Sequence, residues 1–146
     1  MNLPQEAIDI LITIPSTRVK WELSERDLYP TEQTMKMLTD PSEHQLVRQH
    51  LTQSKKLPLD FILKLLNEPT PDEQSKIIYS YLPRNGIVPL EELEKLVDNP
   101  DPNIRNSILL NPNCTAKIVE KLIYDKNNHV RNSALYTWWN RKKTRR

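Results

Sequence analysis

The sequence predicts an all-α protein, a solenoid of about five two-helix repeats, on three observations. Residues 94–109 recur as residues 120–135, at an offset of 26 residues, and self-similarity at a fixed period of 20–50 residues indicates stacked repeats. The 146 residues include twelve prolines and only one glycine, whereas sheet-rich folds use glycine in turns and bulges. Apolar residues also recur along the chain at the spacing of one helix face.

Each predicted repeat begins with a first helix that has a proline near its start, at residues 4, 30, 58 and 89, with Thr115 in the fifth repeat. Proline suits the first turn of a helix, where its missing N–H has no partner to lose. These starts lie 26–31 residues apart. Four, seven and eight residues after each start, 14 of 15 side chains are apolar, and Thr34 is the exception. We expect these positions to form the core.

Each repeat then turns into a shorter second helix, marked by a β-branched residue and an apolar partner four residues later. Thr70-Pro71-Asp72-Glu73 predicts a capping box in the third repeat, with Thr70 as the cap. Asn85-Gly86 and Asn111-Pro112 predict helix ends in the left-handed conformation. The five marker pairs are Val19/Leu23, Val47/Leu51, Ile78/Leu82, Ile104/Ile108 and Val130/Ala134.

The length of the repeats varies only in the turn between their two helices. From each marker to the next repeat the count is always 11 residues, but from the first-helix start to the marker it is 15, 17, 20, 15 and 15. Insertions along one edge of a solenoid often mark its binding face, although a surface loop also tolerates drift. The longest turn, residues 67–72, makes Glu68 and Asp72 candidate partner-binding residues.

Several classes of protein are disfavoured. No apolar run approaches the ~18 residues of a membrane span, and the N-terminus lacks the pattern of a signal peptide, so we expect a cytoplasmic protein with no membrane span. Cys114 is the only cysteine and is expected to be a small, partly buried apolar residue rather than a reactive thiol. The three histidines lie in different repeats, and there is no phosphate-binding glycine loop. We predict no catalytic residue, cofactor or metal, and no enzyme.

Residues 86–135 resemble the leucine-rich repeat variant, a group of the HEAT-like α-solenoids. The matched span is about one-third of the chain, and the motifs that carry the resemblance are residues 98–105, Asn111-Pro112 and Val130-Arg131. It implies a right-handed superhelix with a concave groove for macromolecules and no enzymatic activity. It also implies that an Asp six residues before the Arg bonds across the second helices. Asp125/Arg131 fits this pattern, Asn99/Arg105 fits with an amide, and Ser42/Arg48 departs further.

The sharpest polar pattern is one position of the second helices, occupied by Lys20, Arg48, Tyr79, Arg105 and Arg131. In one interpretation the arginines bond turn carbonyls and carboxylates and so fix the stacking. In the other they form a basic row that meets phosphates or an acidic partner. The candidate partner-binding residues are Arg48, Tyr79, Arg105, Arg131, Trp21, Glu68 and Asp72.

The net charge of +2 is unevenly distributed, with −4 over residues 1–73 and +6 over residues 74–146. The last six residues carry +5, so we divide the chain into a solenoid, residues 1–140, and a basic C-terminal tail, residues 141–146. Two tryptophans precede this tail. Together they form either a nucleic-acid-binding element or a final helix anchored by one or both tryptophans and followed by a solvated tail. The candidate residues are Trp138, Trp139, Arg141, Lys142, Lys143, Arg145 and Arg146.

The leading prediction is a non-enzymatic protein–protein interaction module that binds another protein through its groove and its variable turns, as an adaptor, inhibitor or immunity-type protein. The alternative is a nucleic-acid-binding protein that uses the arginine row and the basic C-terminus.

Overall fold

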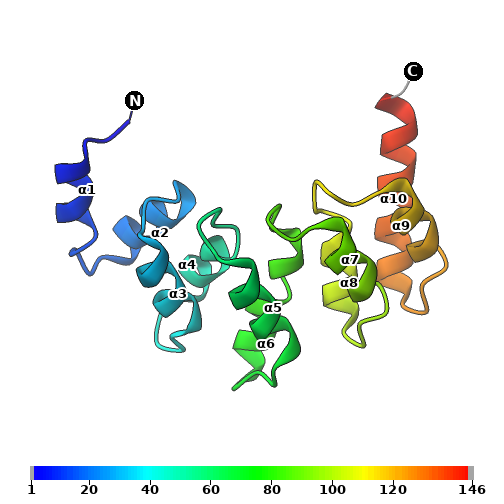
Figure 1. Cartoon of the computed structure of the whole chain (residues 1–146), viewed down its shortest axis with the longest axis horizontal. Helices are drawn as coiled ribbons and strands as arrows, with labels where there is room; N and C mark the ends of the chain where they lie inside the picture. The colour runs from blue at the N-terminus through cyan, green and yellow to red at the C-terminus, as the bar shows by residue number, and fades with distance from the viewer. Residues whose placement is uncertain (1, 145–146) are drawn as a thin grey trace. The chain divides into compact units, whose positions relative to one another are not determined.

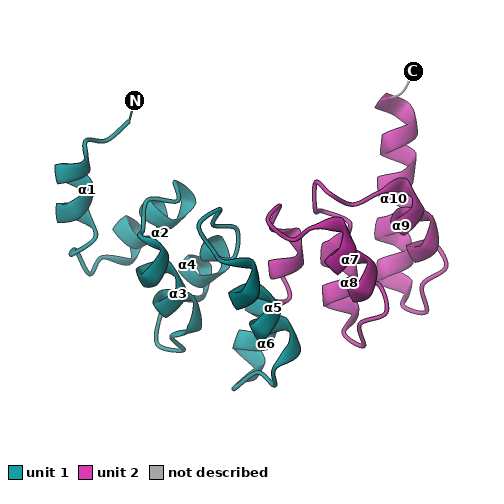
Figure 2. Cartoon of the chain, viewed as in Figure 1, with its two compact units in different colours: residues 1–79 teal, residues 80–146 magenta. Residues whose placement is uncertain are grey.

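The computed structural model of the chain describes residues 2–144. All regular secondary structure in this range is helical, ten α-helices and one short 3₁₀-helix (Figure 1). The all-α prediction is therefore confirmed. The chain forms two compact units, residues 1–79 and residues 80–146 (Figure 2).

Unit 1 contains three pairs of short helices. Helix α2 packs against α4, and α4 also contacts α3 and α6, so the second helices of successive pairs are neighbours. The helices are α1 (Gln5–Leu11), α2 (Thr17–Glu25), α3 (Thr31–Thr39), α4 (Gln45–Leu51), α5 (Leu59–Asn67) and α6 (Glu73–Tyr79).

Unit 2 is built around α8, which contacts η1, α7 and α10, while α9 packs on α10. As in unit 1, the second helices of successive pairs are neighbours, here α8 and α10. The right-handed superhelix remains a prediction. The elements are η1 (Leu82–Arg84), α7 (Leu90–Leu96), α8 (Pro102–Ile108), α9 (Ala116–Leu122) and α10 (Asn128–Thr144).

The predicted apolar frame forms the core. Ten of the fifteen first-helix positions are buried and none is exposed. The polar exception, Thr34, is fully buried because its hydroxyl donates to the carbonyl of Pro30 at 3.0 Å. The residue immediately before each of four first-helix starts is also buried, and the sequence pattern did not reveal this position. These residues are Tyr29, Leu57, Val88 and Cys114.

The prolines lie near the starts of the first helices, as predicted: each of the four is the N-cap, and the helix begins at the next residue. Other local predictions need correction. Asp72, not Thr70, caps α6, which begins at Glu73. Gly86 does not have a positive φ; in the described part of the chain the left-handed residue is Asp27, with φ 55°. Helix α6, the second helix of the third repeat, ends at Tyr79 because Pro83 cannot continue it.

The C-terminal helix crosses the predicted boundary between solenoid and tail. Helix α10 runs from Asn128 to Thr144, so residues 141–144 are helical and continuous with the last repeat. The predicted site residues Arg145 and Arg146 lie outside the described residues. Across residues 2–144, no helix combines the length and the apolarity needed to span a bilayer.

Candidate partner-binding surface

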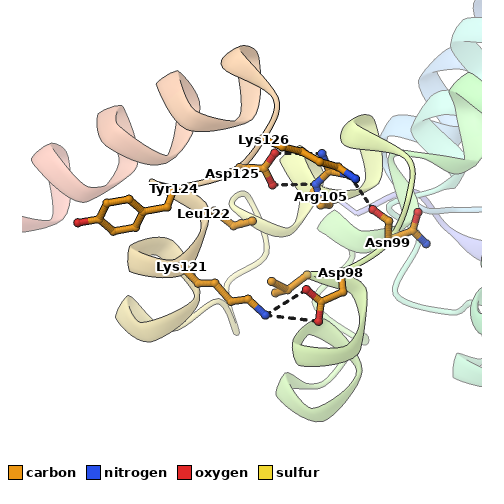
Figure 3. Close-up of a pocket in the computed structure, with 9 residues that line it drawn as sticks. Asp98, Asn99, Arg105, Lys121, Leu122, Tyr124, Asp125 and Lys126 are labelled. Atoms are coloured by element: carbon orange, nitrogen blue, oxygen red, sulfur yellow. Dashed lines mark hydrogen bonds and ion pairs between the residues drawn. The ribbon is translucent and has the colours of Figure 1, made fainter.

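Arg105 joins two repeats of unit 2 (Figure 3). Its Nε and Nη2 donate to the two carboxylate oxygens of Asp125 at 2.8 and 3.0 Å, and its Nη1 donates to the carbonyls of Asn99 and Pro100. Arg105 is 3% exposed. The hydrogen bonds from Arg105 lower the pKa of Asp125. The carboxylate thus comes from the following repeat, while Asn99, six residues before Arg105, contributes its backbone carbonyl and not its side chain.

Arg48 makes an equivalent connection in unit 1. Its side chain is fully buried, its Nε donates to the carbonyl of Leu38 at 2.9 Å, and its Nη2 donates to the hydroxyl of Ser75 at 2.7 Å. Ser75 in turn donates its hydroxyl and its backbone N–H to Asp72, whose pKa these bonds lower. Asp72, predicted to bind a partner, is instead the cap of α6 and the end of this chain of hydrogen bonds.

These contacts correct the prediction of a basic surface row. Arg48, Tyr79 and Arg105 are buried inside their units, so their side chains are not presented to a partner. Arg131 is half-buried, and its Nη1 donates to the carbonyl of Asp125 at 2.8 Å. Lys20 forms an ion pair with Glu43 at 2.8 Å. The contacts favour the interpretation in which this position fixes the stacking of repeats.

The other two candidates of unit 1 are more accessible. Trp21 is half-buried and stands edge-on to the ring of His50, with 5.3 Å between the ring centroids. Glu68 is exposed in the turn between α5 and α6. Of the predicted partner-binding residues in unit 1, these two remain available at the surface.

The basic C-terminal residues make several contacts with other residues of unit 2. Arg141 donates to the carbonyl of Cys114 at 2.8 Å, and so belongs to the fold. Lys142 lies over the ring of Trp138, with its Nζ 3.8 Å from the ring centroid, and Lys143 lies over Trp139 at 5.5 Å. Trp138 is half-buried and Trp139 is exposed. Both lysines remain exposed cations.

A groove between α8 and α10 is a surface that the sequence did not reveal. It encloses about 340 Å³. Asn106 of α8 and Asn132 of α10 line it and are 26 residues apart, at the same position of successive repeats. The Oδ1 of Asn106 is buried and has no hydrogen-bond partner. The remaining lining residues are Leu109, Leu110, His129, Ser133, Tyr136 and Thr137.

The walls of this groove contain no carboxylate, ammonium or guanidinium group, and its rim is apolar. None of its lining residues is an Asp, Glu, Lys or Arg. Leu110 and Tyr136 expose 58% and 70% of their surface, and exposed large apolar side chains grouped at a groove are a feature of binding sites. The repeat register brings the two asparagines into alignment, and this register was the one sequence signal that pointed to the groove.

A second cavity of about 250 Å³ lies beside Arg105 (Figure 3). Its charges are largely paired, since Arg105 holds Asp125 and Lys121 holds Asp98 at 3.1 Å. This leaves few unpaired polar groups to recognise a ligand. In the described range, residues 2–144, no three His, Cys, Asp or Glu residues gather in a way that would hold a metal ion.

Compared with protein-family models, with curated proteins and with solved structures, the chain matches none, so the resemblance to the leucine-rich repeat variant remains a prediction.

Proposed function

We propose that this is a non-enzymatic binding protein whose α8–α10 groove holds an extended segment of another protein. The observation that carries the proposal is the groove itself. Two asparagines at equivalent positions line it, and two exposed apolar residues flank it.

The chemistry of the groove suits a peptide main chain. Each peptide unit presents one N–H donor and one C=O acceptor, and a carboxamide offers both complementary groups. Asn106 and Asn132 therefore match an extended segment that runs across α8 and α10. Leu110 and Tyr136 supply apolar surface for the side chains of that segment, and aromatic residues are enriched at interface cores.

The absence of lysine and arginine from the groove favours protein over nucleic acid as the ligand. Nucleic-acid binding depends mainly on Lys and Arg contacts with phosphates, and no lysine or arginine lines this groove. We therefore keep the adaptor, inhibitor or immunity-type role as the leading function, with the cytoplasm as the expected location.

Nucleic-acid binding through α10 is the second candidate. The helix contains no Asp or Glu, and the exposed Lys142 and Lys143 lie beside two tryptophans. However, the lysines stack on the same rings that would have to receive bases. Binding through these cations would weaken steeply as salt is raised.

Affinity capture from the native host separates the two functions. The baits are the unmodified chain, the groove variant Asn106→Ala/Tyr136→Ala, and the control Lys117→Ala, which changes an exposed residue of α9. We expect one protein to be retained by the unmodified chain and the control, with and without nuclease, and to be lost from the groove variant. Loss of every retained protein after nuclease, or equal retention by the groove variant, would overturn the proposal.

A further inference from the structure

Helix α10 exposes a face that is covered in the equivalent helix α8. Leu109 at the end of α8 is 5% exposed, whereas Leu135, 26 residues later, is 46% exposed. Arg105 is 3% exposed, whereas Arg131 is only half-buried. Helix α8 is covered by its contact with α10. On α10, Arg131, Leu135, Trp138 and Lys142 recur at the spacing of one helix face, and we name them the open face.

The open face contains the guanidinium group of Arg131, and the equivalent Arg105 shows which ligand its free edge prefers. Arg131 donates from Nη1 to the carbonyl six residues before it, as Arg105 does. In Arg105 the remaining edge, Nε and Nη2, holds both oxygens of a carboxylate. In Arg131 the Nε has no partner among residues 2–144, and Nη2 bonds only Asn128 of the same helix, at 3.1 Å. The geometry of α8 therefore identifies a carboxylate as the natural ligand of this edge.

Helix α1 exposes a face that is acidic and apolar, and so complements the basic and apolar open face of α10. Glu6, Asp9 and Ile10 lie on one face, at spacings of three and four residues, and all three are exposed, Ile10 by 66%. Ile8 is the one buried residue of α1, and no side chain caps the helix. Because a helix of seven residues is not stable in water by itself, α1 gains from a further packing surface.

We propose that a second copy of the chain supplies this surface, with α1 of one molecule packed on the open face of α10 of the other. Ile10 packs against Leu135, and a carboxylate of Glu6 or Asp9 accepts from Arg131. The charges of the two helices favour this contact, because α1 contains Glu6 and Asp9 and no Lys or Arg, whereas α10 contains Lys and Arg and no Asp or Glu. The groove residues Asn132 and Tyr136 lie on another side of α10, so this contact is additional to the proposed function.

The contact is heterologous, because two different surfaces meet. Each molecule that joins still has one unused α1 and one unused open face, so association continues into chains unless it closes into a ring. A contact between one short helix and one helix face is at the small end of interfaces, and such interfaces are weak. We therefore expect association that requires high protein concentration and decreases as salt is added.

Sedimentation of the nuclease-treated full chain tests this proposal with the protein as its own probe. The α10-blocked variant is Leu135→Glu/Lys142→Glu, and the α1-blocked variant is Glu6→Lys/Asp9→Lys. All four of these residues are exposed. We expect the mass of the unmodified chain to rise with concentration and each variant to remain a monomer. A mixture of the two variants should form a complex that stops at one copy of each, because each variant retains one intact surface.

A matched control and a gentler variant complete the experiment. Lys117→Glu makes a charge reversal on exposed α9 and should associate like the unmodified chain. Arg131→Gln retains a donor for the Asp125 carbonyl, and we expect it to weaken association about ten- to a hundredfold. If circular dichroism shows that Glu6→Lys/Asp9→Lys does not fold, Ile10→Glu replaces it as the variant that weakens the α1 surface. A monomer at every concentration, or a mixture that forms no heterodimer, would overturn the proposal.

Discussion

Replacing Arg105 with alanine removes the two hydrogen bonds to Asp125 that connect two repeats of unit 2, and two more to backbone carbonyls of its own repeat. The carboxylate of Asp125, whose side chain is 6% exposed, loses its cation, and two backbone carbonyls lose a donor. Breaking a buried pair by removing one partner costs about 3–5 kcal/mol. A whole domain is stable by only about 5–15 kcal/mol, so we expect Arg105→Ala to unfold a large fraction of unit 2 under mild denaturation.

Arg131→Ala is the matched comparison, because Arg131 occupies the same position of the next repeat but is half-buried and holds no carboxylate. We expect it to cost about 1 kcal/mol. Urea titration followed by circular dichroism measures both variants, and calorimetry should show a fall in Tm of about 2–4 °C per kcal/mol for Arg105→Ala. Equal destabilisation by the two variants, or less than about 1 kcal/mol for Arg105→Ala, would refute the interpretation of Arg105 as a link between repeats.

Three further predictions concern single side chains. Burial, assisted by the nearby Glu43, raises the pKa of Tyr29 to about 12. The neutral phenol therefore stabilises the fold by about 2–3 kcal/mol. This stability is complete below the unfolded pKa of about 10 and is lost as the pH rises toward 12. Stability titrated against alkaline pH should show this loss, and Tyr29→Phe should remove it. The lowered pKa of Asp125 contributes stability that is present above its unfolded value of about 4 and is lost as pH falls through the folded value; acid titration should show less of this loss in Asp125→Asn. The amide of buried Asn111 donates to the carbonyls of Pro83 and Asn85, both at 2.8 Å, so Asn111→Ala should cost about 2–3 kcal/mol in urea titration, and a cost near zero would count against that role.

The helical frame was predictable because its signal is local. Apolar residues at the spacing of a helix face define which side of each segment is buried, and this depends only on nearby sequence. The buried position before each first helix was missed because it precedes the helix and therefore lies outside the spacing of the helix face, although its occupants, including Tyr29, Val88 and Cys114, are all apolar. Their burial is decided by packing between helices, which a local pattern does not encode.

The polar contacts show where local reasoning ends. Thr70 and Asp72 are both good N-cap residues, and Asp72 is the cap, with Ser75 joining it to the buried Arg48 of another helix. Likewise, Arg105 bonds the carboxylate of Asp125, 20 residues later, because the stacking of repeats brings them together. The sequence identified the arginines at this position but left open whether they fix the stacking or face a partner, because their burial depends on the neighbouring repeat.

The groove could be predicted only in part. The 26-residue register aligns Asn106 with Asn132, but the unpartnered oxygen and the exposed rim are properties of the packed helices. In the same way, the open face of α10 follows from a comparison of Leu109 with Leu135, whose residue types are identical and whose exposures differ.

Hydrogen exchange of the chain with and without its captured protein partner tests the proposed function most directly. We predict that binding slows exchange at the amides that follow the groove residues of α8 and α10, in residues 106–110 and 129–137, and leaves α3 and α5 unchanged. Protection confined to unit 1, or to the basic residues 141–144, would contradict the assignment of the α8–α10 groove as the binding surface.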